Sequence, residues 1–397
     1  GCATAFDGSA FAALRSLLGG AAPGDSAWPI AGGAIGYFGY ELGRGAAKLA
    51  ALKPGTTAFM PEAAVGLYAW TVVVDHAERR AALTSLASFP DERAAAIRER
   101  LLAGEQPGRE PFRVQGEIGS TLERGDYLPR AARVIDYIRA GDTYQVNLTR
   151  EFRLAFRGDA WEFYRHLHDT NPAPMGAFLE YPFGSVLSSS PERLMTVEGR
   201  EAVTQPIKGT RRRRSDPAED ARVRAELDAS AKDRAENVMI VDLLRNDLGK
   251  VCAIGSVQVP RLFALERYAR VHHLVSTVRG RLAEGRTALD LLRACFPGGS
   301  ITGAPKLRAM EIIEELEPES RGPYGGAVGY MSFTGNMDFC ITIRTMLLKG
   351  ETLSIQVGAG IVADSDPEKE YEETLNKAAG MMKAVKLAAS GFAIGEE

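Results

Sequence analysis

The chain has 397 residues, of which 45% are hydrophobic and 25% charged, and its formal net charge is -3. At this length it is expected to form two domains or one large composite domain with an ample core. Because acidic and basic residues nearly balance, we expect neither nucleic acid nor a membrane as a partner.

The cysteine and hydropathy patterns suit a cytoplasmic protein. The cysteines lie far apart, with no CxxC pair and no histidine cluster beside them. A disulfide framework or a metal–thiolate site is therefore not expected, and a reducing compartment fits best. No apolar stretch approaches the roughly 18 residues that a membrane span requires. The cysteines are Cys2, Cys252, Cys295 and Cys340.

The first third of the chain shows strand-like runs followed by a helix. Apolar and aromatic residues predict strands at 34–40 and 66–75, and a helical pattern covers 91–102. The stretch 103–120 is rich in Gly, Pro and charged residues, so it is the best linker candidate.

The middle of the chain is rich in strands and contains two predicted helices. A helix is expected near 127–140, followed by strands through 143–156 and several shorter strands up to about residue 207. One long helix should cover 217–248, because apolar residues recur there at spacings of three and four. Strands follow at 271–282.

The last third combines hairpins with two helices. A helix should follow Pro305, and hairpin turns are expected near 333–338 and 348–352. A closing helix should begin at Pro367, with Asp366 as its N-cap. Hairpins mixed with a few long helices indicate the α+β class and not a regular βαβ alternation.

The linker divides the chain into two parts. Residues 1–110 form an N-terminal region, which we expect to be incomplete and integrated into the same body. Residues 118–390 form the core that carries the candidate functional residues.

Three glutamates are candidates for a metal site. Glu370, Glu373 and Lys377 are spaced i, i+3 and i+7 on the closing helix, so they share one face. Glu236 opens the apolar half of the long helix. Charge-paired surface helices show similar spacings, so a solvated face is the alternative. If the glutamates converge, their oxygens would suit Mg²⁺ and an anionic substrate.

Two Gly-rich segments, 206–214 and 296–310, allow the backbone to approach a ligand closely. The second leads into a helix, whose first amides suit an anion. Neither segment has the spacing of a P-loop or dinucleotide-binding loop, so a nucleotide is not expected. Lys208, beside Ile207 at a strand end, is a candidate amine nucleophile if it is partly desolvated, with an ordinary lysine as the alternative.

Two further features have simpler interpretations. His272 and His273 lie on an expected strand, so their side chains face opposite sides and at most one enters a given site. The four arginines at 211–214 are typical of a solvated loop, because acidic residues follow them. We assign no function to them.

Many long segments in one order resemble the chorismate-utilising enzymes, which include anthranilate, aminodeoxychorismate, isochorismate and salicylate synthases. The resemblance runs from about residue 30 to residue 385. Its motifs are GAIGYFGYELGR, DTYQVNLTR, SSSPERL, PIKGTR, AKDRAENVMIVDLLRNDLG, VHHLVSTVRG, FPGGSITGAPK, YGGAVGY, ITIRT, VGAGIV and EYEET.

The resemblance implies a fold and a cofactor. The fold would be two large antiparallel β-sheets packed as a sandwich, with helices outside. The cofactor would be Mg²⁺, held by Glu236 and Glu373 with Glu370 close by through water. The ion would bridge to the ring carboxylate of chorismate.

The resemblance also implies roles for the remaining site residues. Glu192 and His273 would flank the hydroxyl that leaves carbon 4. Its departure requires a proton, and a carboxyl in an apolar pocket can keep one near neutral pH, so Glu192 is our first choice as the acid. The residues implied to bind the substrate are Gly209, Thr210, Tyr324, Arg344, Gly358, Gly360, Lys377 and Gln145.

Two positions indicate the nucleophile within this family. Relatives that add water carry a lysine where this chain has Gln145, so attack by water is not expected. The PIKGT form, with Lys208, resembles aminodeoxychorismate synthases, whereas anthranilate synthases look like PIAGT. The resemblance therefore implies that Lys208 attacks carbon 2 as the hydroxyl leaves. Ammonia would then displace it at carbon 4, giving 4-amino-4-deoxychorismate.

The resemblance finally implies a partner. Ammonia should come from a glutamine amidotransferase subunit, because this chain has no evident glutaminase cysteine motif. Relatives have an additional early segment that contributes to a tryptophan pocket, and this chain is expected to start after it. Anthranilate synthase component I is the alternative enzyme, and a non-catalytic subunit that binds chorismate or an amidotransferase is the alternative from another class. Retention of Glu192, Lys208 and the three glutamates argues against the latter.

Overall fold

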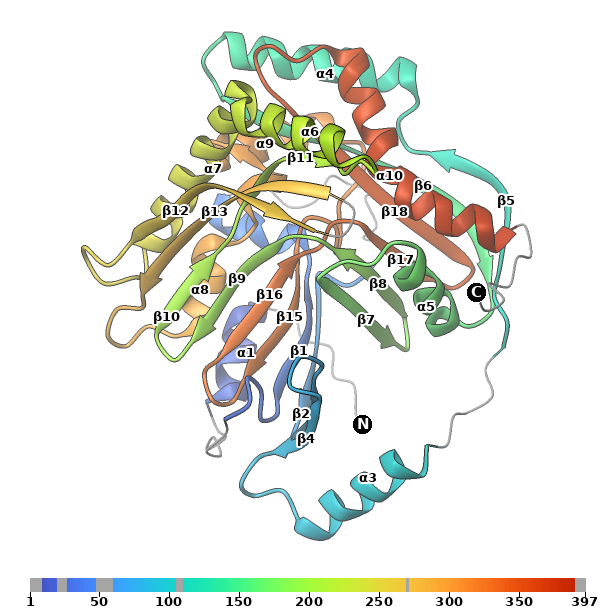
Figure 1. Cartoon of the computed structure of the whole chain (residues 1–397), viewed down its shortest axis with the longest axis vertical. Coiled ribbons are helices and arrows are strands. Elements are labelled where there is room, and N and C mark those ends of the chain that lie inside the picture. Colours follow the sequence, from blue (N-terminus) through green and yellow to red (C-terminus); the bar gives the residue numbers. More distant parts are fainter. Residues whose placement is uncertain (1–8, 20–26, 48–59, 105–109, 269–270, 390–397) are drawn as a thin grey trace.

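The computed structural model describes residues 9–19, 27–47, 60–104, 110–268 and 271–389. In this part of the chain, two large antiparallel sheets pack face to face and helices lie on the outside (Figure 1). The α+β sandwich that the sequence indicated is therefore confirmed.

The larger sheet joins segments from both ends of the chain. Its nine described strands follow the order β11-β13-β10-β9-β16-β15-β1-β2, and β12 pairs with β13. β1 runs antiparallel to β15, so the segment before the linker continues the same sheet as the last third of the chain. The bounds are β1 Gly33–Phe38, β2 Ala63–Tyr68, β9 Arg193–Glu198, β10 Glu201–Thr204, β11 Ile207–Arg212, β12 Gln258–Arg267, β13 Val271–Arg281, β15 Ala327–Ser332 and β16 Met337–Ile341.

The second sheet is built around the longest strand. Its order is β14-β6-β18-β17-β8-β7, and β5 pairs with β6. β6 and β18 pair continuously from Thr352 opposite Ala155 to Ile361 opposite Val146. The bounds are β5 Arg113–Ser120, β6 Gln145–Arg157, β7 Met175–Tyr181, β8 Gly184–Ser190, β14 Gly303–Ala304, β17 Thr345–Lys349 and β18 Thr352–Ile361.

The helices cover the outer faces of the two sheets. α10 packs on β18 and against α4, α9 packs on β6, and α7 packs on β13 and β11 (Figure 1). Short turns of 3-10 helix, η1 Tyr40–Gly43 and η2 Gly299–Ile301, lie in the loops between them. The helix bounds are α1 Ala10–Leu18, α2 Arg44–Ala47, α3 Asp91–Ala103, α4 Arg124–Arg139, α5 Ala160–Thr170, α6 Pro217–Ala229, α7 Ala231–Gly249, α8 Ala288–Cys295, α9 Lys306–Leu316 and α10 Pro367–Ala389.

The closing helix begins where the sequence predicted. The Asp366 side chain accepts hydrogen bonds from the backbone amides of Glu368 and Lys369, at 2.9 and 3.3 Å. Pro367 occupies the first helical position, where a missing amide hydrogen costs nothing. The N-cap prediction is therefore confirmed.

The prediction of one long helix over 217–248 was wrong, because the segment forms two helices. α6 ends and α7 begins at Ser230, whose backbone is extended. The Ser230 hydroxyl accepts a hydrogen bond from the amide of Asp233 and so caps the second helix. The apolar spacing continues across this break, which is why periodicity did not reveal it.

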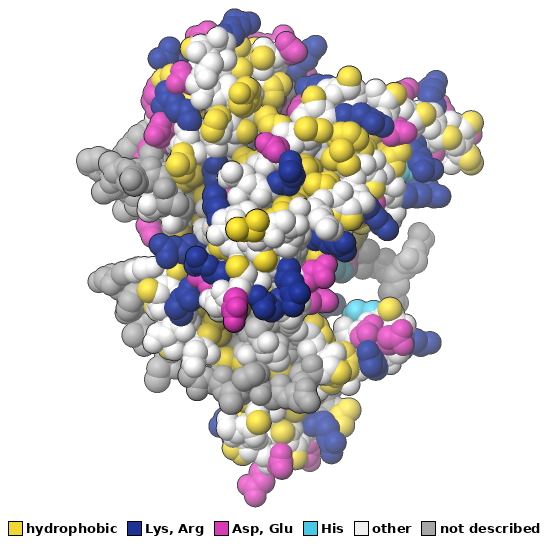
Figure 2. Space-filling model, turned by 90° about the vertical axis from the view of Figure 1, so that its left-hand side faces the viewer, with side chains coloured by type: hydrophobic (Ala, Val, Ile, Leu, Met, Phe, Trp, Pro, Cys, Tyr) yellow, Lys and Arg dark blue, Asp and Glu magenta, His cyan; other side chains and the backbone are white. Residues whose placement is uncertain are grey.

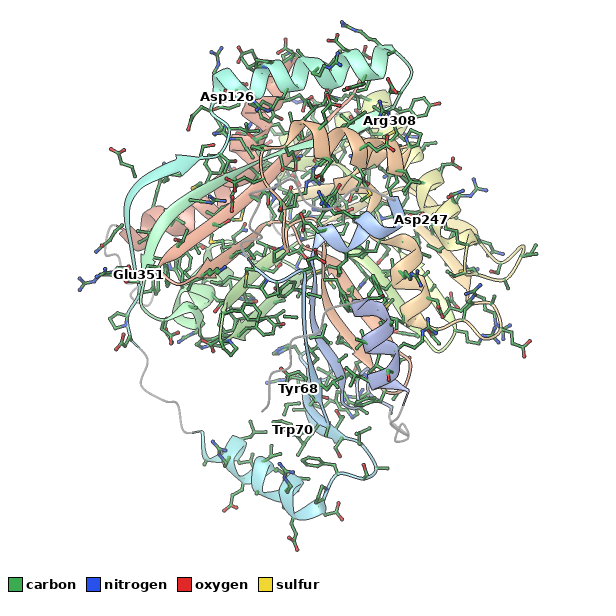
Figure 3. The ribbon with its side chains drawn as sticks, turned by 180° about the vertical axis from the view of Figure 1, so that it is seen from behind. Tyr68, Trp70, Asp126, Asp247, Arg308 and Glu351 are labelled. Atoms are coloured by element: carbon green, nitrogen blue, oxygen red, sulfur yellow. The ribbon has the colours of Figure 1, made fainter. Side chains whose placement is uncertain are left out.

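The single strand predicted at 66–75 was also wrong. β2 ends at Tyr68, and a separate strand, β3 (Trp70–Asp75), pairs only with β4 (Arg80–Ser85) among the described strands. Figure 3 shows Tyr68 and Trp70 at the end of the molecule where α3 lies. The β-rich composition was read correctly, but the change of sheet at Ala69 depends on pairing partners distant in the sequence.

The linker candidate and one of the Gly-rich segments each contain a strand. The linker candidate 103–120 includes β5, which pairs with β6, while residues 105–109 lie outside the described part. The Gly-rich segment 206–214 includes β11, which pairs with β13 through a register shift between Ile207 and Thr210. Backbone hydrogen bonds to a neighbouring strand outweigh local propensity in both segments.

One core cluster includes side chains from both sheets, and Phe339 lies within it. Phe339 is 2% exposed and its ring centroid lies 5.7 Å from that of Phe38. We expect Phe339→Ala to lower the free energy of unfolding by about 3–5 kcal/mol, because it removes buried apolar atoms and leaves a cavity. Equilibrium urea unfolding measures this change.

A matched control is Leu102→Ala, at a side chain that is 80% exposed. It should change the free energy of unfolding by less than about 0.5 kcal/mol. An equally small effect of Phe339→Ala would contradict the placement of this core.

Candidate active site

Lys208 lies where the two sheets meet, with its amine held by residues distant in the sequence. It is the second residue of β11, and its side chain is 15% exposed. Nζ donates a hydrogen bond of 3.3 Å to Oε1 of Gln145, the first residue of β6. Nζ also lies 3.7 Å from Oε2 of Glu236 on α7. The structure therefore brings together three of the predicted site residues.

Gly209 allows β11 to pass close to the two helices behind it. Its φ is +85°, a left-handed conformation that favours glycine. A Cβ there would lie 3.0 Å from the side chain of Asp233 and 2.9 Å from that of Leu227. A larger residue at this position would therefore be strained by its φ and would clash with α6 and α7.

Glu192, which follows β8, is the buried acid of this site. Burial raises the pKa of its carboxyl to about 7, although the ammonium groups of Lys208 and Lys377 oppose the shift. At neutral pH a large fraction of Glu192 therefore remains protonated. A protonated carboxyl beside a primary amine can supply a proton to a leaving group.

His273 faces the site from β13, and His272 faces away from it. Thr210 Oγ1 lies 2.9 Å from His273 Nδ1, and the two residues are paired across β11 and β13. Burial lowers the pKa of His273, which favours the neutral imidazole. His272 Nε2 lies 2.9 Å from Asp220 Oδ1 on α6. The prediction that the two histidines face opposite sides is confirmed.

Cationic groups and small residues line the neighbouring part of the second sheet. Lys377 Nζ donates to the carbonyl of Gly358 at 3.0 Å, and Arg344 Nη1 donates to the carbonyl of Lys377 at 2.7 Å. Burial lowers the pKa of Arg344. Burial also raises the pKa of the Tyr324 phenol to about 12, so Tyr324 can donate a hydrogen bond. This set suits an anionic ligand.

The two glycines predicted to line the site lie on β18, opposite β6. Gly358 pairs with Thr149, and a Cβ there would lie 2.7 Å from the Thr149 methyl carbon. Gly360 pairs with Asn147, and a Cβ there would approach the Gln145 amide carbon to 3.4 Å. Glycine keeps the space beside Gln145 open.

Lysines lie among the three glutamates of the predicted metal site. Glu373 Oε1 is 2.6 Å from Lys377 Nζ, and Glu236 Oε1 is 3.9 Å from Lys232 Nζ. Burial would raise the pKa of Glu373, but Lys377, Lys208 and Lys232 outweigh it and the pKa is lowered. In the described part of the chain, no three His, Cys, Asp or Glu side chains are gathered closely enough to hold a metal ion.

The donor set nevertheless fits a hard cation. Burial raises the pKa of Glu370; its Oε1 accepts a hydrogen bond of 2.6 Å from Ser365, while its buried Oε2 has no hydrogen-bond partner. Glu236, Glu370 and Glu373 offer only carboxylate oxygens, the ligands that Mg²⁺ prefers. Lys208 Nζ and Lys232 Nζ lie 3.7 and 3.9 Å from the Glu236 carboxylate, whose charge a bound cation would also neutralise.

Sequence reasoning missed Lys232 and Asn147. Lys232 is four residues before Glu236 on α7, and this i, i+4 spacing could have placed it at the site. Asn147 is two residues after Gln145 on β6, so strand alternation puts both on one face.

Lys306, in the second Gly-rich segment, has a structural role. Its Nζ lies 2.6 Å from Asp247 and 2.8 Å from the carbonyl of Cys295.

Two of the four arginines at 211–214 lie in a strand. Arg211 and Arg212 belong to β11, so a loop was wrong for them. Arg211 pairs with Asp233 at 2.8 Å and Arg213 with Asp220 at 3.2 Å. Figure 2 shows basic side chains interspersed with acidic ones on one face of the molecule.

No helix in the described part of the chain is long and apolar enough to cross a membrane.

The fold and this site define a class that comparison with known proteins identifies directly. Residues 6–383 match the family described as chorismate binding enzyme, and the chain belongs to that family. Aminodeoxychorismate synthase component 1 of Salmonella typhimurium is 47% identical over 353 residues, covering 88% of this chain and 76% of that protein. Anthranilate synthase component 1 of Streptomyces coelicolor is 44% identical over 400 residues, covering 96% and 78%.

A solved structure supports the same assignment. Anthranilate synthase component I from Streptococcus pneumoniae TIGR4 superposes with a TM-score of 0.85 at 33% identity, covering 95% of this chain and 86% of that one. The chain is thus a chorismate-utilising enzyme with the anthranilate synthase component I fold.

Proposed function

We propose that this chain catalyses the Mg²⁺-dependent amination of chorismate at carbon 4, with Lys208 as a covalent nucleophile, to give 4-amino-4-deoxychorismate for 4-aminobenzoate and folate synthesis. The observation that carries the proposal is the position of the Lys208 amine. It is 3.3 Å from Gln145 and interacts with the buried acid Glu192. Similarity to aminodeoxychorismate synthase component 1 at 47% identity supports it.

The first half of the reaction forms a bond to the enzyme. Lys208 first gives its ammonium proton to solvent. The neutral amine then attacks carbon 2 of the ring, and the two ring double bonds shift toward carbon 4. The bond from carbon 4 to its hydroxyl breaks, and Glu192 donates the proton with which the hydroxyl leaves as water. His273, held by Thr210, would lie beside the departing group.

The second half releases the product. Ammonia attacks carbon 4, the double bonds shift back, and the bond from carbon 2 to Lys208 breaks. The enol pyruvyl ether remains attached throughout, and the new ammonium group gives one proton to the Glu192 carboxylate, which restores the acid. Splitting one difficult substitution into two easier ones is the general advantage of covalent catalysis.

The cationic part of the site would bind the two substrate carboxylates. Arg344, Lys377 and the Tyr324 hydroxyl would hold them, with Gly209, Thr210, Gly358 and Gly360 giving the ring room. Glu236, Glu370 and Glu373 would hold Mg²⁺. When bound, the ion would neutralise the charge of the ring carboxylate and so help to orient the ring.

Glu373→Gln should weaken Mg²⁺ binding by at least about tenfold, because it removes one charged oxygen ligand. Titration calorimetry of the chain with MgCl₂ measures the dissociation constant without turnover. Glu372→Gln, at the exposed neighbouring position on the same helix, is the matched control and should bind like wild type. Equal affinities for all three proteins would place the metal elsewhere.

We further propose that ammonia reaches this chain from a glutamine amidotransferase subunit in the cytoplasm. The relatives are named component 1, which implies a partner subunit. With ammonium salts replacing the partner, the isolated chain should still turn over.

Product analysis tests the proposed function. The purified chain would be incubated with chorismate, Mg²⁺ and ammonium, and an aminodeoxychorismate lyase would then be added. Appearance of 4-aminobenzoate only after the lyase supports amination at carbon 4. Fluorescent anthranilate without the lyase would assign the chain to the anthranilate synthases. This outcome must be tested because the chain is 44% identical to one of them. No turnover with any nitrogen source would favour a non-catalytic subunit.

A further inference from the structure

Arg321 is a buried cation on the loop between α9 and β15. Its side chain is 1% exposed and forms a two-bond ion pair with Glu317, with Nε to Oε2 at 2.8 Å and Nη2 to Oε1 at 2.6 Å. Its guanidinium lies over the ring of Tyr40, 4.4 Å from the centroid. Both partners of the pair are out of water, so their geometry is strongly constrained.

Arg321 also binds the backbone of two segments that build the active site. Nη1 donates to the carbonyl of Ile301 at 2.6 Å, and Nη2 donates to the carbonyl of Asn147 at 2.7 Å. Ile301 belongs to the Gly-rich segment 296–310, and the neighbouring Ser300 side chain acts to lower the pKa of Glu192, which places this segment at the active site. Asn147 lies on β6, two residues after Gln145. One guanidinium thus joins the Gly-rich loop to the strand that carries the partner of Lys208.

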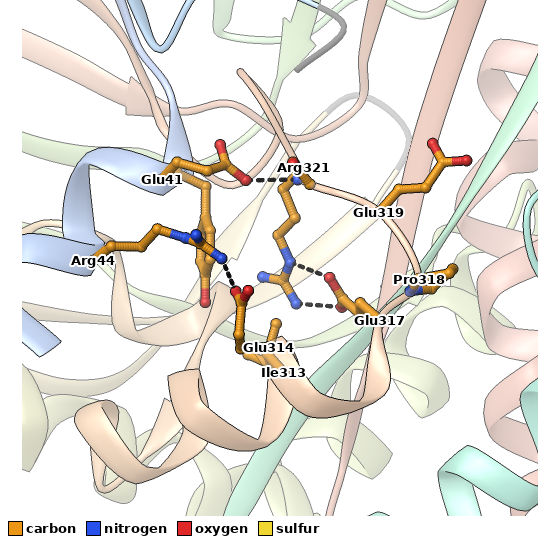
Figure 4. Close-up of a pocket in the computed structure, with 10 residues that line it drawn as sticks. Glu41, Arg44, Ile313, Glu314, Glu317, Pro318, Glu319 and Arg321 are labelled. Atoms are coloured by element: carbon orange, nitrogen blue, oxygen red, sulfur yellow. Dashed lines mark hydrogen bonds and ion pairs between the residues drawn. The ribbon is translucent and has the colours of Figure 1, made fainter. Parts of the chain in front are cut away.

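Glu317 and Glu41 complete the cluster around Arg321. Glu317 Oε1 accepts a hydrogen bond of 2.9 Å from the amide of Thr149, again on β6. Glu41 Oε1 accepts a hydrogen bond of 2.7 Å from the backbone amide of Arg321 (Figure 4). A cavity of about 20 Å³ lies here, enough for a single water molecule. The cluster therefore fixes the loop between α9 and β15 at Glu317 and at Arg321.

Tyr324 depends on the same loop. Its backbone amide donates to the carbonyl of Arg321 at 3.2 Å, and the phenol is buried beside Asn147 and Arg344. A change in the path of residues 321–324 would therefore move Tyr324 relative to Arg344. These are two of the groups assigned to the substrate carboxylates.

We propose that Arg321 is a positioning residue for substrate binding, which holds Tyr324, Asn147 and the Gly-rich loop in register without touching the substrate. The proposal rests on the proposed function, because it concerns residues assigned to chorismate. Lysine cannot replace arginine here, since one ammonium cannot reach Glu317, Ile301 and Asn147 in the same fork geometry.

The test compares KM and kcat of Arg321→Lys with those of wild type under saturating ammonium. KM for chorismate should rise about tenfold or more and kcat should fall by a smaller factor, because Arg321 binds the segments of Ile301 and Asn147, whereas Lys208 lies on β11 and Glu192 follows β8. Calorimetry should show a similar weakening of chorismate binding. A loss of stability alone would leave KM of the folded fraction unchanged.

Arg130→Lys is the matched control. Arg130 also donates to a backbone carbonyl near the end of α9, that of Leu316 at 2.9 Å, and it donates a second hydrogen bond to the carbonyl of Asp126 on α4. It should keep KM within about twofold of wild type. A KM for Arg321→Lys as low as that of this control would overturn the proposal.

Two further outcomes are informative. If Arg321→Lys does not fold, Glu317→Gln replaces it, because this variant loosens the guanidinium while keeping one acceptor oxygen; a severalfold rise in KM supports the proposal, and an unchanged KM overturns it. A wild-type chain that does not convert chorismate would overturn the proposed function and this inference together. Activity in wild type with an unaffected Arg321→Lys would overturn the inference alone.

Discussion

Replacing Lys208 with alanine is expected to lower kcat for 4-amino-4-deoxychorismate formation by at least about a thousandfold, the scale of losing a covalent nucleophile. The amine is placed for attack by Gln145 and Glu236, and no other described lysine is joined to both. Coupling to a lyase and following 4-aminobenzoate measures the rate. Mass spectrometry of quenched wild type should detect a chorismate-derived adduct on Lys208.

Two variants distinguish a nucleophilic role of Lys208 from a purely electrostatic one. Lys208→Arg keeps a cation but presents a guanidinium that stays protonated, so it should be as inactive as the alanine variant. Lys383→Ala, at an exposed lysine on α10, should be unaffected. Retention of more than a tenth of wild-type kcat in Lys208→Arg would rule out the covalent route and leave Lys208 as an electrostatic group.

Glu192→Gln is expected to reduce kcat by about 10²–10⁴-fold, as for other general acids. The acid must be protonated, and its pKa in the folded protein is about 7. Wild-type kcat should therefore fall as pH rises through about 7. The glutamine variant has no proton to lose, so its residual rate should lack this step. A control, Glu198→Gln at an exposed strand end, should retain the wild-type profile.

The same carboxyl gives a stability prediction with a defined sign. The pKa of Glu192 is raised in the folded state, from 4.5 to about 7, so folding favours its protonated form. Its contribution is fully present below pH 4.5 and is lost as pH rises through 7. At pH 8, Glu192→Gln should therefore be more stable than wild type by up to roughly 3 kcal/mol.

Urea unfolding at pH 5 and pH 8 measures this difference. The advantage of Glu192→Gln should be large at pH 8 and small at pH 5. An advantage that is the same at both values would show that Glu192 does not titrate between them, and the proposed acid would then need another identity.

Local signals in the sequence were sufficient for elements that depend on neighbouring residues. Asp366 and Pro367 mark the start of α10 because a cap and a fixed φ act within one turn. His272 and His273 face opposite sides because side chains alternate along any strand. Motif order also indicated the family, which similarity over residues 6–383 confirms.

The sequence by itself determined the α+β class, the family and the chemical types of the site residues. Only the tertiary structure decided what depends on contacts between distant segments. Residues 66–75 divide between two sheets, and α6 stops at Ser230, because strand partners and a capping hydroxyl outweigh periodicity. Lys208 meets Gln145 across 63 residues, and Arg321 meets Asn147 across 174, so no local pattern could predict either contact. Burial, which sets the pKa of Glu192, likewise arises only when both sheets are packed.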